Sequence, residues 1–504
     1  MQEDRVYEGY WWRPATPDAK LPGTLSFSQD EVRLELLGAF EDPKPGPMDL
    51  PGEARLLGVT KGRELITVEN NIGLGLSHNA PGFPVSRYGP HKVLVGALYE
   101  EDEEIRFDEV TIRFSDLDVW AATSGFKQDL RFNKDGTSAA GIDVTFTPPE
   151  PVDVLLDDDT TLSVTWSFTW SGMKRVTTES AITQRAYFKV ASAGGATVDE
   201  MLRFVFHLRN FLSLGVGRPI QVLSVIGVHR PPTDAPGEEQ ERAYPIPVEV
   251  LYRVIGRLEG PPGRELMVDD LLFSLGDVLP RREDIFRSWF ERQDVVGPVF
   301  NRYFYVVHNQ NMVGEVKFES YVRALETYDR RSSKTTRIPA NEHEARMSEI
   351  LASVPDVHRD WLLEELRFSN EPNLAARLKV ALKRCPTISA RLVGNSDERG
   401  SFVRKVTVTR NHEVHLDPEN ERDAATGIPL VVLIYQLRAL IEMTLLLDLG
   451  FTEDTVDAIF HRTGRYREIE KLREQPNIPP TVAPHAVAKE QEAVDPDQTI
   501  LGLG

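Results

Sequence analysis

The sequence predicts an α+β multidomain fold: an all-β, sandwich-like or barrel-like N-terminal domain with one inserted helix, and an all-α C-terminal bundle. Short segments rich in Leu, Val and Ile, separated by Gly, Pro and Asp turns, occupy the chain up to about residue 254. From about residue 282, apolar residues recur at helical spacing instead. The length of 504 residues also exceeds one typical domain. We therefore divide the chain into residues 1–281, 282–473 and 474–504.

The N-terminal segments have the length and spacing of strands in a sandwich or barrel. The predicted strands are 24–27, 32–37, 54–59, 64–68, 92–99, 110–114, 145–146, 162–170, 186–190, 221–228 and 248–254. Thr197 and Glu200 have the spacing of a capping box, so a helix is predicted from Thr197 to Gly215. The polar segment 231–245 is expected at the tip of a hairpin between the last two strands.

The second part of the chain predicts a bundle of helices. They are 282–292, 298–308, 314–331, 341–351, 357–367, 374–383, 401–415 and 428–449. The Val and Thr residues at 403–409 favour a strand by propensity. We nevertheless expect a helix there, from the spacing of Phe402, Val406 and Thr409 together with the family resemblance given below. Polar and charged residues interrupt 428–449, so it is predicted to be a core helix and not a membrane span. Segment 474–504 is polar and contains prolines, which predicts a disordered tail.

Composition narrows the function classes. The formal net charge of −20 argues against nucleic-acid binding over the whole surface. Residues 374–415 are different, because this stretch contains nine basic residues and three acidic ones. This stretch is either a phosphate-binding surface or a solvated helix face, and both interpretations stay open. The single cysteine, Cys385, excludes an internal disulfide and a multi-cysteine zinc site, as expected in a reduced cytoplasm.

The segment RNHEVH at 410–415 brings three candidate catalytic residues together just before the most apolar helix. His415 can move protons near neutral pH, and Arg410 offers a planar set of donors that suits a phosphate. Asn411 adds a neutral donor and acceptor, and on a helix it shares a face with His415. The set fits phosphodiester cleavage. The spacing alone is common, however, and other pairs, such as Arg302 with His308 and Arg337 with His343, satisfy the same loose pattern.

Longer stretches resemble a known family. FESYVRALETYDRR, FSNEPNLAARLKVAL, FVRKVTVTRNHEVH and IPLVVLIYQLRALIEMTLLLDLGF, at 318–331, 368–382, 402–415 and 428–451, resemble an ApeA-like HEPN domain. GYWWRP, GTLSFSQDEVRLELLGAF and FSDLDVWAATSGF, at 9–14, 23–40 and 114–126, resemble the ApeA N-terminal domain. The resemblance covers most of the chain, and it is far more specific than the six-residue segment.

The resemblance implies a metal-independent endoribonuclease without cofactors that acts as an abortive-infection toxin against phage in the bacterial cytoplasm. Arg410, Asn411 and His415 are the implied catalytic residues, and Glu326 and Arg330 match a polar pair of the family that supports them. It also implies a homodimer or higher oligomer through the helical domain, with no membrane association. The N-terminal domain is then a sensor or restraint, released by a phage-encoded trigger protein. The expected substrate is RNA, with tRNA as a candidate. Arg384, Arg404 and Lys405 are the candidate RNA-binding residues.

Other interpretations remain open at this point. The helical domain can instead be a non-catalytic dimerisation or partner-binding module. Alternatively, the β domain binds a glycan or small ligand, with Trp11, Trp12 and Trp120 either stacking on it or packing in the core. The acidic turns at 100–104 and 157–159 allow a calcium site, but no ligand loop of known spacing supports one.

Overall fold

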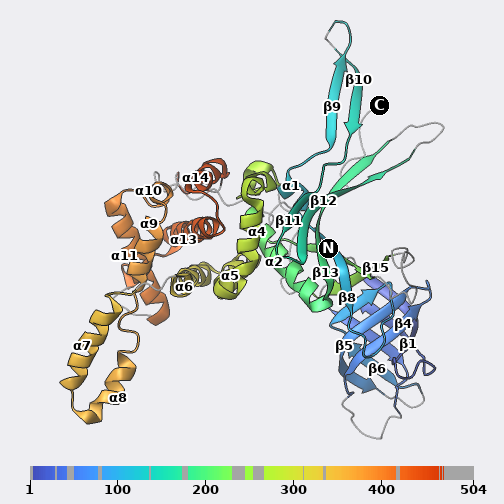
Figure 1. Cartoon of the computed structure of the whole chain (residues 1–504), viewed down its shortest axis with the longest axis horizontal. Coiled ribbons are helices and arrows are strands. Elements are labelled where there is room, and N and C mark those ends of the chain that lie inside the picture. Colours follow the sequence, from blue (N-terminus) through green and yellow to red (C-terminus); the bar gives the residue numbers. More distant parts are fainter. Residues whose placement is uncertain are drawn as a thin grey trace, which may run out of the picture.

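The chain forms a β-rich part followed by a helical part, side by side in an elongated molecule (Figure 1). The computed structural model describes residues 4–28, 31–41, 50–77, 82–135, 138–172, 180–229, 245–253, 266–309, 311–332, 336–415, 421–464, 466–467, 469 and 471. The predicted tail at 474–504 and nearly all of the polar segment 231–245 lie outside these residues.

Fifteen named strands make up the β part. They are β1 (Arg5–Trp12), β2 (Leu21–Phe27), β3 (Val32–Leu37), β4 (Glu53–Thr60), β5 (Leu65–Ser77), β6 (Val85–Gly89), β7 (Lys92–Val95), β8 (Arg106–Phe114), β9 (Phe126–Phe132), β10 (Ala139–Phe146), β11 (Val152–Leu155), β12 (Thr160–Trp170), β13 (Ile182–Thr197), β14 (Val222–His229) and β15 (Ile246–Tyr252). Thirteen of them form one sheet, and β9 and β10 form a separate two-stranded ribbon.

Six strands close into a barrel. The antiparallel order is β5-β4-β1-β2-β3-β6, and β6 pairs back onto β5. Inward-facing residues of these strands fill the interior, among them Trp11, Leu25, Leu34 and Ile66, each with none of its surface exposed. Gly58 leaves the room for the Trp11 ring, because a Cβ there would lie 2.5 Å from it. Closure removes the free edges of these six strands.

The rest of the large sheet runs from β7 through β15, β14, β8, β13 and β12 to β11. One face is covered by α2 (Val198–Val216) and by the short α1 (Leu117–Ala121). The predicted capping box is present, since the Thr197 side chain accepts from the Glu200 backbone and the Glu200 side chain accepts from the Thr197 backbone. α2 buries Val205, Leu208 and Phe211 against the sheet.

Two short elements, η2 (Val268–Asp270) and α3 (Leu275–Val278), lead from the sheet into the second part of the chain, which is helical. The helices of this second part are η3 (Leu279–Arg281), α4 (Arg282–Glu291), α5 (Gln293–His308), α6 (Gly314–Ser332), α7 (Ala340–Ala352), α8 (Asp356–Glu365), α9 (Leu374–Lys383), α10 (Pro386–Leu392), α11 (Ser396–His415), α13 (Gly427–Asp448) and α14 (Glu453–Arg462). α7 and α8 form a hairpin that projects from the bundle (Figure 1). The α+β fold class is therefore confirmed.

The helix α13 is the centre of the helical part. It packs against α6, α9, α10 and α14, and its buried residues include Leu437, Leu440, Ile441 and Leu446. Among the described helices, α13 is the one long and apolar enough to cross a membrane, and 72% of its most apolar window is buried inside the protein. This burial confirms that it is a core helix.

The hydrophobic core does not stop where the strands end. Phe211 of α2 lies with its ring centre 5.4 Å from that of Trp289 in α4 and 5.2 Å from that of Phe273. Phe273 in turn contacts Phe451, just after α13, at 5.4 Å. The two parts also share buried polar contacts, because Arg438 of α13 donates to the carbonyl oxygen of Gly217 at the end of α2. One continuous core therefore joins the sheet to the helices.

Candidate active site

The helix α11 carries the candidate catalytic residues. Its start is capped by Asn395, whose side chain accepts from the backbone N–H groups of Asp397 and Glu398. Phe402, Val406 and Thr409 are buried on one face, as their spacing predicts. The helix wins over the strand propensity of the Val and Thr residues because this apolar face packs against α9 and α6. The predicted helix is confirmed, and it begins five residues earlier than expected.

The C-terminal end of α11 is tied to the segment that leads into α13. The backbone N–H of Ala425 donates to the Thr409 hydroxyl at 2.9 Å, in a buried position. The Lys405 ammonium donates to the carbonyl oxygen of Asp423 at 2.6 Å, and Arg404 lies 3.5 Å from the Asp423 carboxylate. Sequence reasoning missed Thr409 and Asp423 in this role, because their contact partners are separated along the chain. These bonds fix where the last turns of α11 lie.

Arg410 and Asn411 sit in these last turns. An Arg410 guanidinium nitrogen lies 3.4 Å from the Asn411 side-chain oxygen, and both residues are partly exposed. Among the described residues, this contact leaves other guanidinium donors of Arg410 for a ligand. The backbone of His415 ends α11, but its side chain lies outside the described part of the structure. A partly exposed Arg and Asn can together donate hydrogen bonds to a phosphate group.

The predicted supporting pair lies elsewhere in the bundle. Arg330 of α6 forms an ion pair with Glu371 at 3.0 Å. Tyr328, in the same turn, bonds to Asp448 at the C-terminal end of α13. Thr409 bonds next to the N-terminal end of that helix, about 30 Å away at 1.5 Å per residue. The structure therefore does not bring Glu326 and Arg330 to Arg410.

Arg384 also lies at the far end of α13. Its guanidinium donates to Asp448 at 2.6 Å and to the Tyr328 hydroxyl. Burial opposes the charge on Arg384, but the hydrogen bonds to Asp448 and Tyr328 and the negative charge of these two groups together outweigh burial and raise the pKa of the guanidinium. Burial first, and the Asp448 charge second, raise the pKa of Tyr328 to about 12. Of the three candidate RNA-binding residues, only Arg404 and Lys405 share a helix with Arg410.

The structure bears on two alternatives for the β part, the stacking of a ligand on tryptophans and a calcium site at the acidic turns. Trp11 and Trp120 have none of their surface exposed and Trp12 has 7%, so all three pack in the core and none offers a stacking face. Within the described residues, no group of three or more His, Cys, Asp or Glu side chains is arranged to hold a metal ion. That includes the acidic turns at 100–104 and 157–159, which are described in full.

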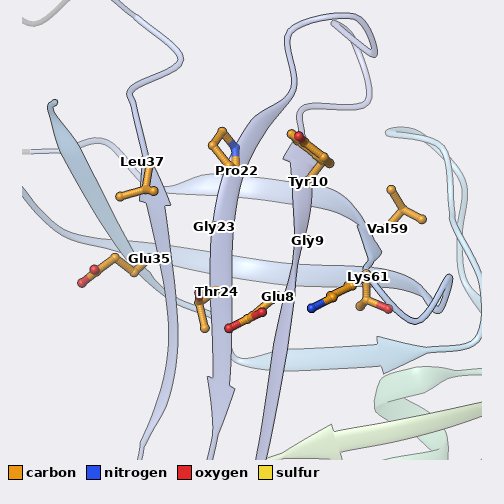
Figure 2. Close-up of a pocket in the computed structure, with 11 residues that line it drawn as sticks. Glu8, Gly9, Tyr10, Pro22, Gly23, Thr24, Glu35, Leu37, Val59 and Lys61 are labelled. Atoms are coloured by element: carbon orange, nitrogen blue, oxygen red, sulfur yellow. The ribbon is translucent and has the colours of Figure 1, made fainter.

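The β part nevertheless has a hollow on the outside of its barrel, with a volume of about 500 Å³. Strands β1 to β4 line it, and the paired glycines Gly9 and Gly23 lie at its middle (Figure 2). Tyr10 and Leu37 project at one end, with 56% and 52% of their surface exposed. The remaining lining residues are Glu8, Pro22, Thr24, Glu35, Val59, Thr60 and Lys61.

Comparison with known families assigns both parts of the chain. Residues 6–289, more than half of the chain, match the model of ApeA N-terminal domain 1. Residues 319–455, which contain all of α11 and α13, match the model of the Apea-like HEPN domain. No curated protein and no solved structure matches the chain. The chain therefore belongs to the ApeA-like HEPN defence proteins, with an ApeA N-terminal domain 1 followed by an Apea-like HEPN domain.

Proposed function

We propose that this protein is an endoribonuclease whose active site is Arg410, Asn411 and His415. The observation that carries the proposal is the hydrogen-bonded, partly exposed pair of Arg410 and Asn411 at the anchored end of α11. This pair lies within the segment that matches the HEPN model, a domain type that is generally a nuclease. Arg404 and Lys405 supply positive charge on the same helix.

The proposed reaction needs the ribose 2′-hydroxyl as its nucleophile. His415 takes the 2′-hydroxyl proton, the 2′-oxygen attacks the adjacent phosphorus, and the bond from phosphorus to the 5′-oxygen breaks. The 5′-oxygen leaves with a proton from an acid, so the products are a 2′,3′-cyclic phosphate and a 5′-hydroxyl. Arg410 stabilises the charge that develops on the phosphate oxygens, and Asn411 orients the groups. Because the His and Arg supply these roles themselves, the step needs no metal. DNA lacks the nucleophile and is not cut.

One His supplies a base or an acid, but not both at once. We therefore propose a homodimer through the HEPN domain, with two copies of the RNHEVH segment facing one RNA strand. The family supports this, since HEPN domains commonly dimerise and bind RNA. His415 of one copy then acts as base while the same residue of the second copy acts as acid. Structured RNA such as tRNA is the proposed substrate, in the bacterial cytoplasm.

The β part is proposed to sense or restrain the nuclease, with the chain dividing functionally into 1–281, 282–473 and the tail 474–504. The shared core supports this role, because α2 of the β part contacts α4, α5 and α13 directly. If a phage-encoded trigger protein displaces part of the sheet, the shared core transmits that displacement to the helices of the HEPN domain. Activation then stops growth of the infected cell.

The barrel hollow favours a second function for the β part, the binding of a small ligand or of a partner's side chains. Its exposed Tyr10 provides a flat apolar surface, and Glu8 and Lys61 at the other end provide charge (Figure 2). Thr24→Trp would fill the hollow from its floor. Loss of triggered activity in this variant, with His415-dependent cleavage intact in a trigger-independent assay, supports a sensing role for the hollow; an unchanged response argues against it.

The decisive test is induced expression of wild type, Arg410→Ala and His415→Ala, with and without phage, followed by growth and total-RNA integrity. If the nuclease proposal holds, wild type arrests growth and produces fragments with 2′,3′-cyclic phosphate ends, and neither variant does. Circular dichroism and sedimentation check that both variants fold and associate. If folded variants arrest growth and fragment RNA as wild type does, the HEPN domain is a non-catalytic partner-binding module.

A further inference from the structure

The ribbon formed by β9 and β10 projects from the sheet (Figure 1). The register of its two strands gives it one apolar face. Leu130 pairs with Ile142, and Gln128 pairs with Val144, so these side chains share one face. Charged and polar residues such as Arg131, Asp143 and Thr145 occupy the opposite face. The ribbon is therefore as amphipathic as a strand pair that covers a core.

Nothing in the described chain covers that apolar face. Leu130, Ile142 and Val144 have 50%, 65% and 51% of their surface exposed, and Phe132 has 59%. A soluble protein rarely exposes so many large apolar side chains together without a partner. An isolated two-stranded ribbon is also only marginally stable in water. The face needs a permanent cover.

A second ribbon contacts the base of the first through an aromatic side chain. Beyond the body of the sheet, β12 and β13 continue as a pair, on which Phe168 and Trp170 are each 50% exposed. Phe168 lies 5.2 Å from Phe146 at the base of the β9–β10 ribbon, measured between ring centres. Gln184 of β13 locks this base by bonding to the backbone of Gly125 and Thr123. The two ribbons are thus held as one preorganised apolar surface.

Charge identifies what fits this surface. The chain carries a net charge of −20, so two copies repel over most of their surface. The strands β9 and β10 carry two basic and two acidic residues, and β12 carries no charged residue. The β9–β10 ribbon, whose strands carry no net charge, is therefore a place where two copies can meet with little repulsion. Aliphatic side chains at Leu130, Ile142 and Val144 suit protein packing and offer no stacking surface to a nucleic acid base.

The exposed area is sufficient for a dimer. Six half-exposed large side chains leave roughly 100 Å² each, or about 1,200 Å² over two copies, which reaches the lower limit of specific interfaces. A trigger protein is present only at certain times, whereas a second copy is present whenever the protein is. We propose that the apolar face of the β9–β10 ribbon packs against the same face of a second copy of this chain, with Phe168 and Trp170 at the edge.

The matched test compares Ile142→Glu on the apolar face with Thr145→Glu on the polar face of the same strand. Both positions are exposed, so neither change threatens the fold. Sedimentation equilibrium is expected to give a dissociation constant at least about 100-fold weaker for Ile142→Glu, with half the associated mass, because a charge is then buried without a partner. Thr145→Glu is expected to match wild type. This interface is independent of the HEPN dimer, so His415→Ala leaves it unchanged.

A crosslink identifies the contact itself. The chain's one cysteine, Cys385, is buried, so Ile142→Cys adds the only exposed thiol. Mild oxidation is expected to link two copies through Ile142→Cys and not through Thr145→Cys. The proposal is overturned if Ile142→Glu associates as wild type does, if wild type shows no association that depends on the ribbon, or if no crosslink forms. Loss of RNA binding in Ile142→Glu with unchanged association would also overturn it, and would assign the face to RNA.

Discussion

At the scale of single residues, α11 presents two kinds of arginine. Arg410 bonds to Asn411 in the proposed catalytic set, whereas the side chain of Arg404 is 78% exposed and lies 3.5 Å from Asp423. Arg410→Ala should lower the cleavage rate of bound RNA about 10²- to 10³-fold, since it removes stabilisation of developing charge. Arg404→Ala should leave that rate nearly unchanged and reduce the salt slope of RNA binding by about one.

Single-turnover cleavage at saturating protein separates these two effects, and fluorescence anisotropy gives the salt slope. Arg410→Lys is a useful companion, because it keeps the charge but loses the planar fork. An equal loss of rate in Arg404→Ala and Arg410→Ala would contradict the assignment of distinct roles.

His308 makes stability depend on pH. Its ring nitrogen lies 3.3 Å from the Ser213 hydroxyl at the contact between α5 and α2. Burial first, and the positive charge of Arg209 second, lower the pKa of His308 from 6.5 to about 3. Below pH 6.5, His308 therefore binds a proton in the unfolded chain but stays neutral in the folded chain. The contribution to stability is present above pH 6.5 and is lost as the pH falls toward 3, by about 1.4 kcal/mol per pH unit.

Urea unfolding at a series of pH values, on wild type and on His308→Gln, measures this term. Gln is neutral at every pH and keeps a hydrogen-bonding partner for Ser213. The difference between the two proteins should grow as the pH falls below 6.5, because the carboxylates that titrate in the same range are common to both. Parallel curves would show that His308 accepts its proton in the folded state.

At the scale of elements, the junction of α11 with α13 depends on one hydroxyl. Thr409 has none of its surface exposed and accepts from the backbone N–H of Ala425. Thr409→Val keeps the shape but leaves that buried N–H without a partner, which should cost about 1–3 kcal/mol in the free energy of unfolding. Thr409→Ser keeps the acceptor and should cost less. Chemical denaturation measures both, and equal costs would mean that the methyl group, not the bond, matters.

The helix α13 carries a network of charged and polar side chains that is buried in the core. Glu442 has none of its side chain exposed, and it accepts from Arg438, Tyr303 and Tyr466. Burial opposes the charge on Arg438, yet Glu442 raises its pKa well above the usual value. Glu442→Ala leaves that guanidinium without its carboxylate and should destabilise the fold by about 3–5 kcal/mol.

The double variant Arg438→Met with Glu442→Leu is the informative control for this network. Because it removes both charges and restores apolar volume, it should be more stable than Glu442→Ala in the same denaturation experiment. A double variant as unstable as the single one would show that the bond from Arg438 to Gly217 is the important contact.

At the scale of the whole molecule, the continuous core predicts cooperative unfolding. Phe211, Phe273, Trp289 and Phe451 form one chain of contacts from the sheet to the helices. Calorimetry of the full chain should therefore show one main transition. A fragment that begins at residue 282 should expose the faces of Trp289 and Phe451 and bind a hydrophobic dye. Two well-separated transitions, or a fragment that is soluble and binds no dye, would show that the two parts fold independently.

The sequence by itself determined the fold class, the helix with the RNHEVH segment, the buried character of α13 and the family. Each depends on local periodicity or on long matched segments, which a window along the chain contains. Local reading missed β9, because four of its five central residues are polar or charged and it lies on a ribbon outside the core. It also missed the short helices α10 and α14.

Only the tertiary structure decided how these pieces meet. Barrel closure needs β6 to pair with both β3 and β5. The burial of Trp11 and Trp120, the pairing of Arg330 with Glu371, and the separation of Arg384 from Arg410 likewise depend on distant partners. Propensity and spacing act over a few residues, whereas these contacts join residues tens to hundreds of positions apart. These contacts form, and stabilise the protein, only when the chain has folded, so no local pattern in the sequence could reveal them.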